Sequence, residues 1–198
     1  MRRAACLALA ALWLALAGNP CPARAADDGF DKALAGAKRG YGQHRPGLTL
    51  ESLRLAMELA WPRFPFQALN VHLTTELPAG FGVFTPRPDN HFQPGDPLFL
   101  YLEPVGFEVK KDEAHGLYLY DLAADFNLVD GRGNVVGGRR DFARFQGKSR
   151  YFPQRLPLNF TYSLKGLPPG DYTVETIIRD RLAHRSFTIK TPVVVERP

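Results

Sequence analysis

The chain contains residue types that can do chemistry, but their spacing departs from the loops that bind phosphate or calcium. Gly147-Lys148-Ser149 has the ending of a phosphate-binding loop, yet that loop needs another glycine at the position of Phe142. The segment 130–134 offers oxygen ligands, but Arg132 and Val135 stand where a helix-loop-helix calcium loop needs an acid or amide and a glycine. The sequence therefore predicts a plain hairpin turn at 130–134.

Histidines and acids also fail to assemble a catalytic pattern. The densest polar cluster is Asp89-Asn90-His91, followed by Asp96, while the five histidines are dispersed. A serine nucleophile would need a Gly-x-Ser-x-Gly elbow, which the sequence lacks. Asp121 and Asp125 are spaced as exposed neighbours on one strand, and no pattern places either in an apolar pocket. We expect no catalytic residue, no cofactor and no metal.

The first 25 residues have the pattern of a cleaved export signal. An arginine pair precedes an uninterrupted apolar run from Cys6 to Gly18, and Ala23-Arg24-Ala25 supplies small residues at the two positions that a signal peptidase reads. Such a run spans only about 20 Å as a helix, against about 30 Å of hydrocarbon core. The sequence predicts cleavage after Ala25, no transmembrane segment afterwards, and a periplasmic or extracellular location.

Cleavage would also change the charge and the thiol content of the chain. It removes three of the 25 basic residues and none of the 20 acidic ones, so the formal net charge falls from +5 to +2. We therefore expect no nucleic-acid partner. Both cysteines, Cys6 and Cys21, lie in the removed segment, so the mature chain would have neither a disulfide nor a thiolate metal site.

Residues 26–63 are predicted to form a loosely ordered lead-in over 26–46 and one amphipathic helix over 49–61. Thr49 can cap this helix and Pro62 ends it. Apolar residues recur at three- and four-residue spacing, which indicates one buried face. The stripe consists of Leu50, Leu53, Met57 and Ala60.

From residue 64 to residue 198 the sequence predicts a β-sandwich domain. The apolar period switches to two after Gln67, and turn residues separate the runs, which is typical of about seven antiparallel strands. The parity of the apolar positions changes at Glu103-Pro104, so we expect a bulge or bend there. The clearest alternating runs are 69–75, 98–102, 118–128, 156–164, 172–178 and 187–195.

A short corner between two of these strands adds a fold-specific signal. Leu167 opens the segment, Gly170 permits a sharp turn, and Tyr172 can donate its hydroxyl to upstream backbone as a tyrosine corner. This corner resembles the last two strands of immunoglobulin-like or fibronectin-III-like modules in exported bacterial proteins. Residues 92–104 are similar to segments of uncharacterised secreted bacterial proteins. The resemblance covers roughly residues 92–195 and implies a Greek-key sandwich, with no catalytic residue to transfer.

Four apolar side chains fall on the expected outer face of the sandwich. Phe99 and Tyr101 lie on one strand, and Leu117 and Leu119 on the next. If these strands pair, they form an apolar patch where a two-layer sandwich is normally polar. Two explanations remain open: the helix at 49–61 covers the patch, or the patch receives an envelope protein or a glycan.

The sequence thus favours a non-enzymatic exported β-sandwich that binds or scaffolds an envelope component. The apolar patch and the proline-rich loop at 86–97 are the expected contact surfaces. One alternative is a hydrolase or metal-dependent enzyme that uses loop acids and His91. The other is a purely structural accessory domain of an envelope assembly.

Overall fold

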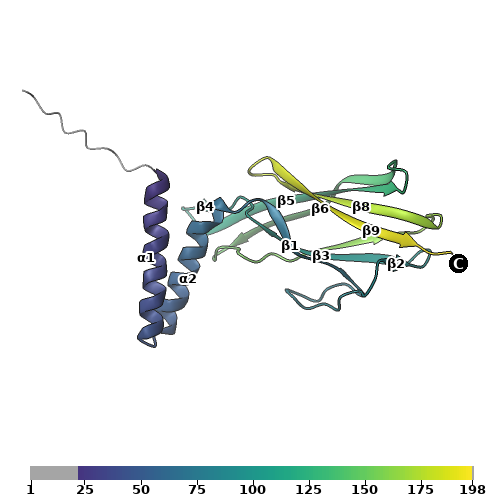
Figure 1. Ribbon diagram of the computed structural model, residues 1–198. Helices are drawn as coiled ribbons and strands as arrows, with labels where there is room; N and C mark the ends of the chain where they lie inside the picture. The colour runs from purple at the N-terminus through teal and green to yellow at the C-terminus, as the bar shows by residue number, and fades with distance from the viewer. Residues whose placement is uncertain (1–21, 198) are drawn as a thin grey trace, which may run out of the picture.

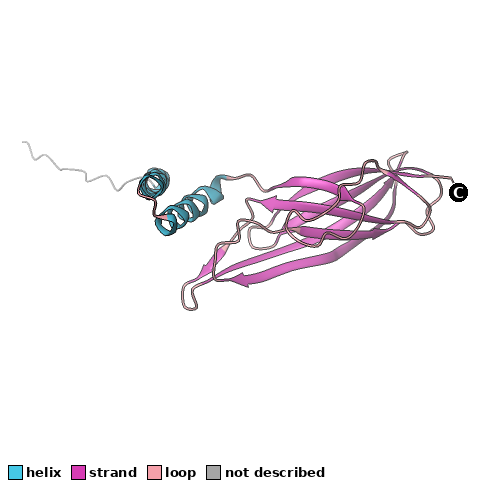
Figure 2. Cartoon of the chain, turned by 90° about the horizontal axis from the view of Figure 1, so that it is seen from below, coloured by secondary structure: helices cyan, strands magenta, loops and turns pink. Residues whose placement is uncertain are grey.

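The computed structural model describes residues 22–197, which form a β-sandwich with a pair of helices at one end (Figure 1). Helix α1 (Pro22–Gly42) and helix α2 (Pro46–Ala60) lie side by side, and the short 3-10 helix η1 (Trp61–Arg63) leads into the first strand. The C-terminus lies at the opposite end of the sandwich, so the helices project away from it (Figure 2).

The prediction of a loosely ordered lead-in over 26–46 is wrong, because α1 occupies most of that range. Two of its glycines, Gly36 and Gly40, allow close approach to α2 and are not turn residues. A Cβ on Gly36 would come within 2.8 Å of the Ser52 hydroxyl, and one on Gly40 within 2.7 Å of the Thr49 hydroxyl. The glycine-rich composition therefore reflects a tight helix–helix contact.

Helix α2 matches the predicted helix but begins three residues earlier. Pro46 occupies its first turn, where the missing N–H of proline costs no helical hydrogen bond. Thr49 is not the N-cap, since its hydroxyl donates to the carbonyl of Arg45 at 3.0 Å from inside the first turn.

Nine strands form two sheets within the described residues. In the three-stranded sheet, β3 lies between β1 and β7. In the six-stranded sheet, β9 pairs with β2 and β8, β8 pairs with β5, and β5 also pairs with β4 and β6; every pairing is antiparallel except β2–β9. The bounds are β1 (Gln67–Thr74), β2 (His91–Phe92), β3 (Pro97–Val105), β4 (Lys110–Asp112), β5 (Leu117–Asp130), β6 (Val135–Ser149), β7 (Leu158–Ser163), β8 (Gly170–Asp180) and β9 (Arg185–Val195).

The core lies between the two sheets and follows the predicted two-residue alternation. Inward positions of β3, β5, β7 and β8 are mostly buried, and most of their neighbours are more exposed, with Tyr101 and Ala123 as buried exceptions. A polar pair sits within this apolar layer: the hydroxyls of Tyr162 and Thr176 hydrogen-bond at 2.7 Å, and burial raises the pKa of Tyr162. The fully buried residues include Leu98, Leu100, Leu102, Leu122, Ala124, Leu158, Val174 and Ile178.

The bulge predicted at Glu103-Pro104 lies instead in the partner strand. Strand β3 continues through Pro104, which pairs with Ala68, and the register shift falls in β1 at Asn70, whose φ is 50°. Strand β7 pairs with β3 only as far as Leu102. Pro104 is therefore an edge position on that side, and its missing N–H leaves no gap in a ladder.

The hairpin predicted at 130–134 is present and leads into a strand much longer than the sequence suggested. The carboxylate of Asp130 accepts hydrogen bonds from the backbone N–H groups of Arg132 and Asn134, at 2.9 and 2.8 Å. Strand β6 then runs on to Ser149, whereas the sequence indicated only that the turn leads into Val135 and Val136. This strand is polar because it pairs with β5 alone and forms a sheet edge.

The corner between β7 and β8 has the predicted hydrogen bond. The Tyr172 hydroxyl donates to the carbonyl of Pro168 at 2.8 Å, and Gly170 adopts a φ of 155°. Leu167 packs against the core beneath this turn. The chain is thus fixed at the point where it passes from the three-stranded to the six-stranded sheet.

Candidate functional site

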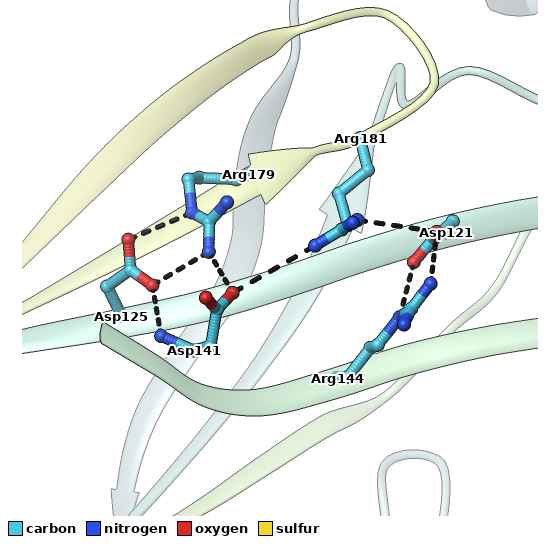
Figure 3. Close-up of polar contacts among 6 residues, drawn as sticks. All are labelled: Asp121, Asp125, Asp141, Arg144, Arg179 and Arg181. Carbon is cyan, nitrogen blue, oxygen red and sulfur yellow. Dashed lines mark hydrogen bonds and ion pairs between the residues drawn. The ribbon is translucent and has the colours of Figure 1, made fainter. Parts of the chain in front are cut away.

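The densest group of charged side chains lies on the outer face of the six-stranded sheet (Figure 3). Arg144 donates two hydrogen bonds to Asp121, at 3.1 and 2.8 Å. Arg179 donates two to Asp125, both at 2.9 Å, and a further one to Asp141. We call this the arginine–aspartate network; it comprises Asp121, Asp125, Asp141, Arg144, Arg179 and Arg181.

The electrostatics of this network favour a structural role. Hydrogen bonds from Arg144 lower the pKa of Asp121. Burial raises the pKa of Asp125, but hydrogen bonds from Arg179 and from the backbone N–H of Asp141 lower it further, so the net shift is downward. Both carboxylates are therefore held ionised by neighbouring cations. The network fastens the irregular turn of β6 at Asp141, whose φ is 50°, onto β5 and β8.

The two loop acids of the enzyme hypothesis serve local turns, and the His91 ring contacts the residue that follows β9. Asp89 accepts a hydrogen bond from the backbone N–H of His91 at 3.1 Å, and Asp96 accepts one from Gln93 at 3.0 Å. The Nδ1 atom of His91 lies 3.2 Å from the Oε1 atom of Glu196. Across residues 22–197, no group of three histidine, cysteine or acidic side chains is placed to hold a metal ion.

The predicted apolar patch is not assembled. Phe99 and Tyr101 belong to β3 in one sheet, whereas Leu117 and Leu119 belong to β5 in the other, and the two strands do not pair. Tyr101 is fully buried, with the ring of Phe84 at a centroid distance of 4.5 Å. The segment before β2 covers this position, so the explanation in which the helix at 49–61 covers the patch is wrong for Tyr101.

The helix pair is instead held at the end of the sandwich by η1 and the last turn of α2. The indole of Trp61 is buried, and its ring meets those of Phe107 and Phe152 edge-on, at centroid distances of 5.2 and 5.4 Å. The Tyr118 hydroxyl donates to Glu58 at 3.0 Å. Burial, and the neighbouring Glu58 carboxylate, raise the pKa of Tyr118. These contacts fix α2 against the sandwich.

The apolar stripe of α2 consequently faces a groove and not a sheet. Leu50, Leu53 and Met57 remain 53%, 47% and 36% exposed. Between this stripe and the loop at 150–156 lies a groove of about 790 Å³, which we call the α2 groove. Its opposite wall is formed mainly by Tyr120, Phe152, Pro153 and Leu156.

A second groove of about 580 Å³ continues from the first over the three-stranded sheet. The two share Met57, Gln154 and Arg155, and the second passes over exposed Leu69 and Phe81. Several of the exposed large apolar side chains of the described chain therefore border one continuous depression. The sequence revealed the helical stripe but not the loop that faces it.

One arginine stands where the two grooves meet. The guanidinium of Arg155 lies 4.7 Å from the centroid of the Phe81 ring, and no carboxylate within residues 22–197 forms a salt bridge with it. Arg54, which also borders the α2 groove, is paired with Glu51 at 3.1 Å. The carboxylate of Glu103 also lines the second groove, but it accepts a hydrogen bond from the Tyr101 hydroxyl at 2.7 Å and forms no salt bridge with Arg155. The α2 groove thus combines apolar walls with one arginine that has no salt-bridge partner among the described residues.

The chain matches no protein-family model and no curated protein. Between Pro22 and Arg197, none of the helices has both the length and the apolar character needed to cross a membrane.

Proposed function

We propose that this protein is a non-enzymatic exported β-sandwich protein that binds or scaffolds an envelope component through the α2 groove. The exposed stripe of Leu50, Leu53 and Met57 is the observation that carries this proposal. Contiguous exposed apolar surface with a charged rim is characteristic of interaction sites. The contacts of Trp61 hold one wall in place, so the groove is preformed and little ordering entropy opposes binding.

We further propose that the sandwich is of the immunoglobulin-like or fibronectin-III-like kind. The order β1-β3-β7 corresponds to strands A, B and E, and the neighbours β9, β8, β5 and β6 correspond to G, F, C and C′. The bond from Tyr172 to Pro168 falls at the E–F corner in this correspondence. Such sandwiches hold binding surfaces of many kinds, so the topology supports a platform and not a particular ligand.

Export follows from the first 25 residues, of which 1–21 lie outside the described range. Cleavage after Ala25 would fall within the first turn of α1 and leave the contacts of Gly36 and Gly40 with α2 intact. The exported chain would therefore keep both helices and the α2 groove.

A site-specific photocrosslinker tests the binding role. A diazirine amino acid replaces Leu53 in the groove or, as a control, Val135, which is 62% exposed on the β5–β6 hairpin. We expect irradiation in producing cells to give one defined adduct at position 53 and none at 135, seen by intact mass. Equal labelling of both positions, or none at either, would overturn the proposal.

A further inference from the structure

We propose that the α2 groove binds a single-chain anionic amphiphile, with its head group on Arg155 and its chain along the stripe from Met57 to Leu50. This inference rests on the proposed function and names the ligand class of that site. The volume of about 790 Å³ lies within the range of small-molecule sites. The groove follows α2 for seven residues, or about 10 Å at the rise of a helix, which suits the inner part of one alkyl chain.

The walls favour an alkyl chain over a peptide. Helix α2 satisfies its own backbone groups, so the wall that it supplies offers no free peptide groups to an extended peptide strand. Such a strand would bury unpaired N–H and C=O groups there, which is costly. An alkyl chain has no polar groups to satisfy and gains from each apolar contact with Leu50, Leu53 and Phe152.

The charge at the groove specifies the head group. Arg155 is the cation without a salt-bridge partner among the described groove residues, since Arg54 is paired with Glu51. A carboxylate or phosphate ester can accept two parallel hydrogen bonds from one guanidinium. Because Arg155 stands at the junction with the second groove, the head would lie at the Met57 end and the chain would extend toward Leu50.

Calorimetric titration with sodium decanoate, kept below its micelle concentration, tests this proposal, with decanol as the neutral chain of equal length. We expect saturable one-to-one binding of decanoate and at least about tenfold weaker binding of decanol, because a charge-assisted pair is lost. Arg155→Gln should weaken decanoate binding by about tenfold. Arg150→Gln is the matched control, since Arg150 lies in the same loop but borders a different groove, and should bind as the native protein does.

A second pair of variants tests the apolar wall. Leu53→Asp should abolish binding, and Leu34→Asp, at an exposed position of α1, should leave it unchanged. Thermal unfolding identifies any variant that fails to fold, and Leu53→Ala, expected to weaken binding several-fold, then replaces Leu53→Asp. Equal affinity for decanol and decanoate, or equal losses in Arg155→Gln and Arg150→Gln, would overturn the inference. The inference would also be overturned if decanoate did not bind while the photocrosslinker at position 53 captured a protein. That outcome would leave the proposed function standing.

Discussion

The indole Nε1 of Trp61 donates a hydrogen bond to the backbone carbonyl of Phe107 at 2.7 Å, across 46 residues of chain. It thereby joins the end of the helix pair to the segment that follows β3. Gly106 makes this junction close, because its φ is 69° and a Cβ there would lie 2.5 Å from the carbonyl oxygen of Pro65. The position of the α2 groove depends on this junction.

Trp61→Phe should lower the free energy of unfolding by about 1–3 kcal/mol, because the buried carbonyl of Phe107 loses its donor. Denaturant unfolding followed by far-UV circular dichroism measures the change. Fluorescence does not serve here, since Trp61 is the only tryptophan after residue 25. Tyr41→Phe, at a side chain that is 79% exposed, is the control. Equal stability of Trp61→Phe and native protein would remove Trp61 from this role.

Tyr172→Phe should cost about 0.5–1.5 kcal/mol, since it deletes the hydroxyl bonded to Pro168 and keeps the ring. The same denaturant titration measures this change in the free energy of unfolding. A loss no larger than that of Tyr41→Phe would mean that the corner bond contributes nothing to stability.

The sequence predicted the parts of the fold that depend on alternation. Strands β3, β5, β7, β8 and β9 were evident because apolar residues recur at alternate positions, most of which are buried or half-buried. Strand β6 was missed beyond its first two residues because an edge strand with arginines has no such pattern; only its contacts place Phe142 and Phe145 against the core. Helix α1 was missed because close helix contacts select glycine, which otherwise indicates turns.

The site was harder to predict than the fold. The stripe from Leu50 to Met57 was recognised, but periodicity does not say which surface a stripe faces. The prediction of an apolar patch was wrong for the same reason. Tyr101 and Leu119 both stand at odd-numbered positions, but β3 and β5 belong to opposite sheets. Pairing between strands is a long-range property that one sequence does not reveal.

Acid should weaken the fold through the arginine–aspartate network. The pKa values of Asp121 and Asp125 are lowered in the folded state from the ordinary value of 3.8. The stability that these two carboxylates contribute is therefore fully present above pH 3.8, and it is lost as the pH falls through their pKa values in the folded state. Asp125→Asn should be less stable than the native protein at neutral pH. Between about pH 5 and pH 2 it should lose less unfolding free energy than the native protein, and the difference should be roughly the contribution of one carboxylate. Urea titrations at several pH values measure this, and parallel pH profiles for both proteins would contradict it.

Export should leave a chain that begins at Ala26. Intact mass and N-terminal sequencing of the protein recovered from producing cells measure the start, and the formal net charge should then be +2 because three arginines are removed. A recovered chain that retains residues 1–25 would contradict export by this route.

Hydrogen–deuterium exchange of the exported protein, with and without envelope extract, tests the role of the α2 groove most directly. The account predicts slower exchange in 46–60 and 150–156 when extract is present, no change across the arginine–aspartate network, and no protection in Leu53→Asp. Protection confined to the outer face of the six-stranded sheet, or identical protection in Leu53→Asp, would contradict it.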